Sequence, residues 1–295
     1  MPELPEVETI VNDLRKKIVG RKITGVWFDI PKLRGKFPEK QIKGLKIVDV
    51  KRRGKNILIY LDSKILLIHQ KMTGHLLYGK WKITKVSIRQ SADKSFKVVS
   101  LIKGALEEKV NNYIHFILYL DNDWQVGLSD LRKFAKILFG GKDEIENLAD
   151  LKNLGPEPLD ANFKFVKFVK LIKTQKRKIK QVLMDQNVIA GIGNIYSDEI
   201  LWQAKIHPFR KANELRVNEL KNLYIAMKEI LIKAVKLRGT SVSDFRDAFG
   251  KSGGYAKIRK VYRRENESCP RCGSMIKRIK IGGRSAHYCS QCQKI

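Results

Sequence analysis

The sequence predicts an α+β protein with an N-terminal helix, a β-sandwich or β-barrel, a helical region and a C-terminal β-hairpin that binds zinc. Three observations support this prediction. Apolar residues recur with a helical period near the N-terminus, and β-branched and aromatic runs follow from about residue 21 to 140. All four cysteines lie in the last 27 residues. A chain of 295 residues has room for two or three such domains.

The first element is a helix that starts near Pro5. Apolar residues spaced three and four apart form one face of it, namely Val7, Ile10, Val11, Leu14 and Ile18. Gly20 comes next, and glycine commonly ends a helix because it adopts the left-handed conformation without strain. Glu3 and Glu6 lie three residues apart at the helix start, so we expect their carboxylates on neighbouring parts of its positive end.

Strands follow the helix. Six runs rich in β-branched and aromatic residues are separated by Gly, Asp, Asn or Lys: "KITGVWFDI", "LKIVDVKRR", "NILIYL", "KILLIHQ", "YIHFILYLD" and "WQVGLSD". They predict a sandwich or barrel behind the helix. The stretch 79–112 interrupts them; it is basic and weakly patterned, and we interpret it as an extra hairpin and loop.

Helical periodicity returns at about 162–238, after the turn-rich linker "NLGPEPLDANF". The segment "VIAGIGNIYSDEI" breaks this periodicity with two glycines and an asparagine. Glycines let backbone N–H groups approach an anion, and a following helix N-terminus favours negative charge. The segment is therefore either a phosphate-binding turn or a plain connection between two helices.

The charge of the chain points to a polyanionic partner. Lys and Arg number 60 against 30 Asp and Glu, a formal net charge of +30, which favours nucleic acid or an anionic membrane surface. No apolar run approaches the roughly 18–20 residues of a membrane span, and the N-terminus lacks a basic-then-apolar signal pattern. We expect a cytoplasmic protein with no membrane partner.

The cysteines have the spacing of a metal site. Cys269 and Cys272 form one CxxC pair, and Cys289 and Cys292 form a second pair after 16 intervening residues. Four sulfurs complete a tetrahedral shell, which predicts one structural Zn²⁺. The turn between the pairs, "IGGRS", presents Arg284 to its surroundings. A ribbon for protein contacts is the alternative, but the basic surroundings favour a nucleic-acid backbone.

Two further segments, "HQKMTGH" and "DLRKF", follow strand-like runs and carry large side chains. Met72 and Phe134 are either ordinary core residues or, with Arg132, a wedge that fills a duplex from which a base has been removed.

Several motifs together are similar to those of one family. "MPELPEVETI" at the N-terminus, "LGPEPL", "GIGNIYSDE", "AKIHP" and a C-terminal zinc finger with "GGR" before "YCSQCQ" resemble the formamidopyrimidine-DNA glycosylases, whose members remove oxidised purines such as 8-oxoguanine. The resemblance runs from residue 2 to 294. It implies a β-sandwich rather than a barrel, a helix–two-turn–helix domain and a β-hairpin zinc finger, which we assign to 1–150, 151–245 and 246–295.

The resemblance also implies an active site. Pro2 would be N-terminal once Met1 is removed, and its amine would attack C1′ of the damaged nucleotide. An α-amine has a pKa of about 8, well below the pKa of a lysine side chain, so part of it is unprotonated at neutral pH. Glu3 would transfer protons, and Glu6 would hold the sugar or orient the amine. Lys55 would assist β-elimination or bind phosphate; a solvated lysine at a strand end is the alternative.

The DNA-binding residues implied by the resemblance come from all three domains. Arg284 would grip the phosphates flanking the lesion and assist δ-elimination. Lys176 and Asn194 would contact the backbone. The side chains inserted into the duplex would be Met72, Arg132, which would face the orphaned cytosine, and Phe134.

Other positions implied by the resemblance lie in a loop and in a strand. Thr240 and Ser241, in a loop that closes over the flipped base, would touch that base. Where the family has a His-x-His pair, this chain has Tyr113-Ile-His115, so either residue could take the DNA contact.

The sequence therefore predicts a monomeric, nucleoid-associated glycosylase and lyase that acts on double-stranded DNA. Two alternatives stay open. One is a glycosylase of the same superfamily for oxidised pyrimidines. The other is a non-catalytic DNA-binding zinc-finger protein, which would bind DNA without nicking it.

Overall fold

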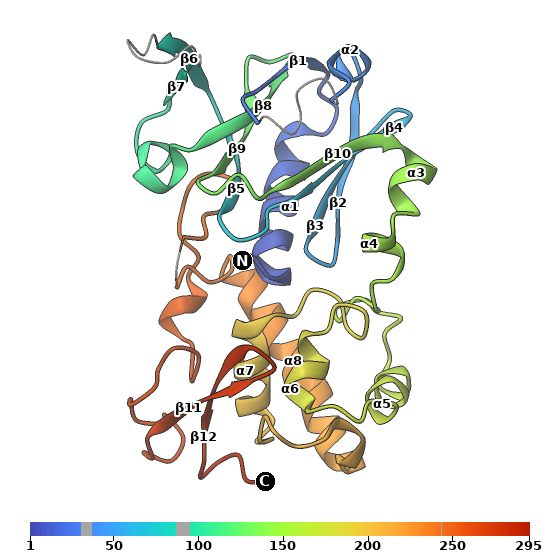
Figure 1. Ribbon diagram of the computed structural model, residues 1–295, viewed down its shortest axis with the longest axis vertical. Helices are drawn as coiled ribbons and strands as arrows, with labels where there is room; N and C mark the ends of the chain where they lie inside the picture. The colour runs from blue at the N-terminus through green and yellow to red at the C-terminus, as the bar shows by residue number, and fades with distance from the viewer. Residues whose placement is uncertain (31–36, 87–94, 243) are drawn as a thin grey trace. The chain divides into compact units, whose positions relative to one another are not determined.

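The computed structural model describes residues 1–30, 37–86, 95–242 and 244–295. It divides into two compact units. The sandwich unit contains Met1–Pro2, Glu6–Leu148 and Thr240–Gly253, and the helical unit contains Glu3–Pro5, Ala149–Gly239 and Gly254–Ile295. Each unit is described separately below (Figure 1).

Helix α1 (Leu4–Ile18) has the apolar face that the sequence predicts. Val7, Ile10, Leu14 and Ile18 are all fully buried in the core of the sandwich unit. Gly20 has a φ of +86°, as expected of a glycine that ends a helix.

Two antiparallel four-stranded sheets form the sandwich, so the barrel alternative is wrong. One sheet has the order β1 (Ile23–Phe28), β8 (Ile114–Leu120), β9 (Gln125–Asp130), β5 (Gly74–Gly79). The other has the order β10 (Lys136–Gly141), β4 (Lys64–His69), β3 (Asn56–Leu61), β2 (Ile47–Arg53). Short helices α2 (Glu39–Ile42) and α3 (Lys142–Glu146) belong to the same unit.

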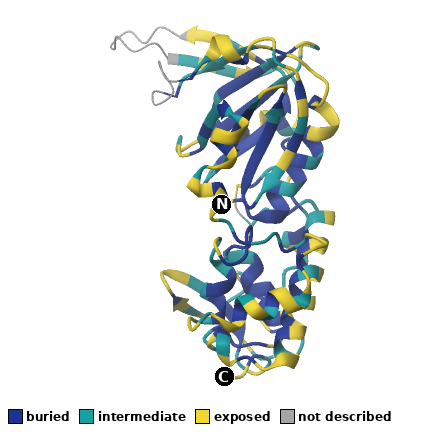
Figure 2. Cartoon of the chain, turned by 90° about the vertical axis from the view of Figure 1, so that its right-hand side faces the viewer, coloured by how far each residue is buried: buried dark blue, intermediate teal, exposed yellow. Residues whose placement is uncertain are grey.

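All six predicted strands are present, and the structure adds β5 and β10. Both added strands, "GHLLYG" and "KILFGG", end in glycine and contain only a short apolar run. Such runs carry no alternation from which a strand can be recognised. Buried residues from α1 and from both sheets form one core (dark blue in Figure 2).

The predicted extra hairpin is confirmed where the structure describes it. Strands β6 (Trp81–Val86) and β7 (Ser95–Ser100) pair antiparallel, and two short 3₁₀ helices, η2 (Ala105–Glu107) and η3 (Lys109–Asn111), follow; residues 87–94 lie outside the described part. Trp81 anchors the hairpin to the first sheet. A Cβ on Gly127 of β9 would lie 3.0 Å from the indole ring of Trp81, so the absence of a side chain at Gly127 makes room for this ring.

The helical unit contains α4 (Ala149–Lys152), α5 (Phe165–Lys173), α6 (Ile179–Met184), α7 (Asn194–Gln203) and α8 (Val217–Lys236). They share a core to which Leu4 also contributes. The hairpin of β11 (Ile276–Ile281) and β12 (Arg284–Cys289) completes this unit. In the described residues, no helix has both the length and the apolar character needed to cross a membrane.

Acid should destabilise the sandwich unit through His75 of β5. Burial lowers the pKa of this imidazole from 6.5 to about 4. The unfolded chain therefore binds a proton that the folded protein does not bind between these two values, so stability falls as the pH drops from 6.5 towards 4. We expect a loss of up to about 3 kcal/mol. Urea unfolding at pH 7 and pH 4.5 measures it, and a His75→Asn variant that kept the full loss would contradict this assignment.

Candidate functional site

The carboxylate of Glu3 is held by backbone amides of the helical unit. Its Oε2 accepts hydrogen bonds from the N–H of Gly193 at 2.7 Å and of Tyr196 at 3.3 Å, and its Oε1 accepts one from Ile195 at 2.8 Å. The side chain is 2% exposed. These donors lie at the N-terminus of α7, which also favours a negative charge. Glu3 is thus held in place by this turn; Pro2, the residue before it in the chain, is itself buried.

Two glycines of the "GIGN" turn make room for the N-terminal residues. A Cβ on Gly193 would lie 2.5 Å from Cδ of Glu3, and one on Gly191 would lie 2.7 Å from Cβ of Leu4. Leu4 also donates its N–H to the carbonyl of Gly191 at 2.9 Å. The amides of this turn thus bind the carboxylate of Glu3, a ligand that neither of the two sequence alternatives, a phosphate-binding turn and a plain connection, had named.

Glu6 has a separate partner in the sandwich unit. It is 1% exposed, and its Oε1 accepts the N–H of Thr240 at 2.7 Å. The hydroxyl of Ser241 donates to the carbonyl of Phe245 at 2.6 Å and accepts the N–H of Gly253 at 2.9 Å. Ser241 thereby joins the two ends of the loop Thr240–Gly253.

Lys55 lies just before β3, after Gly54, whose φ is +57°. Its side chain is buried, with 6% exposed. The alternative of a solvated lysine at a strand end is therefore wrong.

Met72 and Phe134 are exposed, so the alternative that they are core residues is also wrong. Met72 lies in the turn between β4 and β5, and Arg132 and Phe134 lie between β9 and β10. The guanidinium of Arg132 stacks over the ring of Phe134, 4.4 Å from its centroid. The two turns meet at Asp130.

Asp130, which was not predicted from the sequence, is 1% exposed and binds both turns. Its Oδ1 accepts the hydroxyl of Thr73 at 2.5 Å and the N–H of Arg132 at 3.3 Å, and its Oδ2 accepts the N–H of Ala135 at 2.7 Å. The signal available in the sequence was an aspartate at the end of the strand-like run "WQVGLSD". Its hydrogen bonds link the turn that carries Met72 to the turn that carries Arg132 and Phe134.

Tyr113 and His115 lie at the start of β8. The Nδ1 of His115 is 2.7 Å from Oδ1 of Asp29, and Oδ2 of the same carboxylate is 3.5 Å from Nζ of Lys133. Tyr113 is bound through its backbone, whose carbonyl accepts the N–H of Asp130 at 2.8 Å. The ring of His115 is thus oriented by an acidic partner.

The predicted backbone contacts of the helical unit lie at turns. Lys176 is exposed between α5 and α6, and Asn194 begins α7. Arg284 is exposed directly after the hairpin turn, where Gly282 and Gly283 have φ values of +54° and +75°. A Cβ on Gly282 would lie 2.6 Å from Nε2 of Gln181, so the turn lies against α6.

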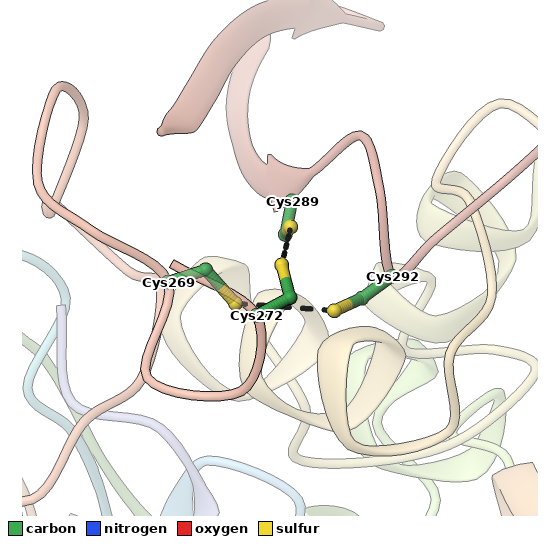
Figure 3. Close-up of side chains that lie close together, drawn as sticks. All are labelled: Cys269, Cys272, Cys289 and Cys292. Carbon is green, nitrogen blue, oxygen red and sulfur yellow. Dashed lines mark hydrogen bonds between the residues drawn. The ribbon is translucent and has the colours of Figure 1, made fainter. Parts of the chain in front are cut away.

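The four cysteines meet as the sequence predicts (Figure 3). Their Sγ atoms all lie within 4.8 Å of one another. The Cys272–Cys289 pair is 3.4 Å apart and the Cys269–Cys292 pair 4.0 Å apart. Zn–S bonds of about 2.3 Å in a tetrahedron separate the sulfurs by about 3.8 Å, so the cluster fits zinc. The backbone N–H of Ser274 lowers the pKa of Cys272 to about 6, whereas burial raises the pKa of Cys289 and of Cys292, so metal binding must release protons from those two thiols.

Asp198 of α7 holds the zinc-finger hairpin through its carboxylate, a role that was not predicted from the sequence. Its Oδ2 accepts the backbone N–H and the ring Nδ1 of His287, both at 2.9 Å, and its Oδ1 pairs with the buried ammonium of Lys180.

Glu199, the next residue, holds the segment that leads into the finger. It accepts the backbone N–H groups of residues 260–262 at 2.8–2.9 Å. The signal available in the sequence was the pair of adjacent acids in "GIGNIYSDE", directly before the apolar residues "ILW". Acids that become buried in such a segment need partners.

Comparison with known proteins agrees with this arrangement. Residues 1–137 match the model of the formamidopyrimidine-DNA glycosylase N-terminal domain, 154–246 match its H2TH domain, and 266–295 match the zinc finger found in FPG and IleRS. A curated formamidopyrimidine-DNA glycosylase of Pelotomaculum thermopropionicum is 38% identical over 100% of both chains. One from Desulforamulus reducens is 39% identical over 100% of this chain and 99% of its own.

Solved structures agree as well. The Lactococcus lactis Fpg, in complex with DNA containing an abasic site, has a TM-score of 0.82 and 32% identity, covering 99% of this chain and 100% of its own. The Thermus thermophilus protein has a TM-score of 0.81 and 32% identity, covering 99% and 98%.

The sandwich, the helix–two-turn–helix unit and the four-cysteine hairpin together define a zinc-finger DNA glycosylase of base excision repair. Within that class, the chain belongs to the formamidopyrimidine-DNA glycosylase family.

Proposed function

We propose that this protein excises oxidised purines, such as 8-oxoguanine and formamidopyrimidines, from duplex DNA and then cleaves the strand at the resulting abasic site. The observation that carries the proposal is the carboxylate of Glu3, which three backbone amides hold in place one residue after Pro2 in the chain. A structural relative from Lactococcus lactis supports the substrate class, since it is described with Fapy-dG-containing DNA.

Pro2 would be the nucleophile. After removal of Met1 its secondary amine forms a bond to C1′ while the bond from C1′ to the base breaks, and the base leaves with the bonding electrons. Glu3 delivers a proton to the sugar ring oxygen, the ring opens and a Schiff base remains between Pro2 and C1′. Loss of a C2′ proton then expels the 3′ phosphate, and a second elimination expels the 5′ phosphate.

Three other residues would assist this sequence. Glu6 holds the sugar or orients the amine, Lys55 takes part in β-elimination or binds a phosphate, and Arg284 grips the phosphates flanking the lesion during δ-elimination. Lysine and arginine suit these tasks because each elimination releases a phosphate anion.

DNA binding would use the remaining predicted residues. Lys176 and Asn194 contact the backbone, and Tyr113 or His115 adds a contact from the sandwich unit. The exposed Met72, Arg132 and Phe134 fill the space left by the flipped base, and Thr240 and Ser241 lie on the loop over that base. We propose that the protein acts as a monomer in the cytoplasm, on the nucleoid.

One incubation tests the proposal. An 8-oxoguanine:C duplex is treated with the protein, with and without borohydride, beside a thymine glycol duplex. We expect a borohydride-trapped adduct and a one-nucleotide gap with 8-oxoguanine. Preferential cleavage of thymine glycol would assign the protein to oxidised pyrimidines instead, and binding without nicking would make it non-catalytic.

Gly193→Ala should abolish most of the excision activity. Its Cβ would lie 2.5 Å from the carboxyl carbon of Glu3, so the carboxylate must leave its three amides. We expect single-turnover excision to fall by more than about 100-fold, the size of effect typical for a displaced catalytic acid, with little change in DNA affinity. Gly25→Ala is the matched control, because its nearest neighbour would be an ordinary 3.6 Å away. Equal rates in both variants would contradict the role of Glu3.

A further inference from the structure

The loop Thr240–Gly253 has an ordered internal structure. Asp247 is 1% exposed, and its Oδ1 accepts the N–H groups of Phe249 and Lys251, each at 2.9 Å. Ser241 joins the two ends of the loop through its hydroxyl. Except for residue 243, which is outside the described part, the loop is a compact turn held by its own polar groups.

This loop is also docked on the open edge of a sheet. Strand β5 is the last strand of its sheet, and the N–H of Tyr78 in β5 donates to the carbonyl of Ala248 at 2.7 Å. Phe245 and Ala248 are buried in the core of the sandwich unit. The loop thereby covers a strand edge that would otherwise expose unpaired backbone groups (orange beside β5 in Figure 1).

The segment Gly104–Asn112, after the extra hairpin, also contacts the loop. The Nδ2 of Asn111, a fully buried side chain, donates to the carbonyl of Ala105 at 2.8 Å and to that of Gly250 at 3.4 Å. A carboxylate oxygen of Glu108 accepts Nε–H of Arg246 at 3.0 Å.

The two segments are in close contact at Gly250. This glycine has a φ of +79°, and an added Cβ would lie 2.9 Å from the carbonyl oxygen of Ala105 and 2.9 Å from Nδ2 of Asn111. Burial of His75, whose side chain lies beside Asn111, lowers the pKa of its imidazole to about 4. The imidazole is therefore neutral at physiological pH and adds no charge to this contact.

We propose that the segment Gly104–Asn112 is a clamp that holds the loop Thr240–Gly253 in place before DNA binds, with Asn111 and Glu108 as its positioning residues. The inference rests on the proposed function, in which this loop covers the flipped base. A loop ordered in advance spares the complex the entropy of ordering it. Excision therefore depends on the clamp. Cleavage at a site that has already lost its base does not, because there is no base to cover.

The variants Asn111→Asp and Glu108→Gln test the clamp in the full-length protein. Aspartate has the size of asparagine but cannot donate to the two carbonyls; Glu108 is exposed at 48%, so its replacement leaves folding intact. We expect faster amide exchange at residues 247–253 without DNA. Excision of 8-oxoguanine should slow about 5- to 10-fold for Asn111→Asp, as expected for one or two lost hydrogen bonds, and less for Glu108→Gln. Cleavage of an abasic duplex should stay within about twofold.

Asn112→Asp is the matched control: Asn112 is not one of the two positioning residues, and its side chain donates to the carbonyl of Glu107 within the segment rather than to the loop as Asn111 does. In this control variant, amide exchange at residues 247–253 and excision of 8-oxoguanine should equal those of the parent protein. Unchanged loop exchange in both test variants would overturn the clamp, as would an equal fall in excision and abasic cleavage. If the parent protein acts on neither duplex, the proposed function fails, and exchange in the DNA-free protein alone decides the clamp.

Discussion

A protein that retains Met1 should lose borohydride trapping by more than about 10³-fold, a size comparable to removal of a catalytic nucleophile. The reason is chemical: with Met1 in place, the nitrogen of Pro2 is part of an amide and has no lone pair available for C1′. The amine of Met1 cannot replace the amine of Pro2, because Met1 precedes Pro2 and its amine is therefore displaced by one residue from the reacting position. Pro2→Gln tests this state: its large side chain hinders removal of Met1, so the nitrogen of residue 2 stays part of an amide.

Mass spectrometry of the N-terminus shows which form is present in each preparation. Trapping on an abasic duplex then compares the two forms at equal DNA occupancy, so that a change in affinity is not mistaken for a change in chemistry. Pro2→Gly is the informative companion, since glycine permits removal of Met1 and restores an α-amine at the same position. We expect measurable trapping with Pro2→Gly and almost none with retained Met1. Full trapping with Met1 present would exclude Pro2 as the nucleophile.

Sequence patterns predicted the parts of the fold that have a strong period or a fixed spacing. The face of α1, six strands and the CxxC pairs are local signals, and the structure confirms each. Strands β5 and β10 were missed because their glycine-bounded runs have no period. The choice between sandwich and barrel depends on which strands pair, which a single sequence does not contain.

The partners of the site residues were harder to predict. The amides of the "GIGN" turn face a carboxylate located about 190 positions earlier in the chain, as the bond from Gly193 to Glu3 shows. Asp198 binds His287, 89 positions away. Both motifs can be recognised in the sequence, but the partner of each lies far away in the chain and cannot be identified from the motif alone. Because the same glycines suit a phosphate and a carboxylate equally well, the chemistry alone left the ligand undecided.

Removal of zinc should release the C-terminal hairpin and weaken DNA binding by more than about 100-fold. A structural zinc contributes about 10–16 kcal/mol to folding of a small finger, far more than the few buried residues around the cysteines, Trp202, Val261 and Ile276, can replace. Loss of the finger removes Arg284 and its neighbouring cations from the proposed DNA-binding surface. Each phosphate contact adds to the binding free energy, so the loss of several contacts together lowers the affinity far more than the loss of one.

Cys272→Ser is the variant of choice, because Cys272 is exposed and its replacement disturbs the metal more than the packing. Metal analysis should find one zinc in the parent protein and none in the variant. Arg284→Ala is the matched control: it keeps the four cysteines and loses one cation, so its affinity should fall only about 3- to 10-fold. The ratio of the two losses of DNA affinity separates the contribution of the zinc-dependent fold of the hairpin from the contribution of the Arg284 charge. Equal affinities in the two variants would mean that zinc does no more than present Arg284.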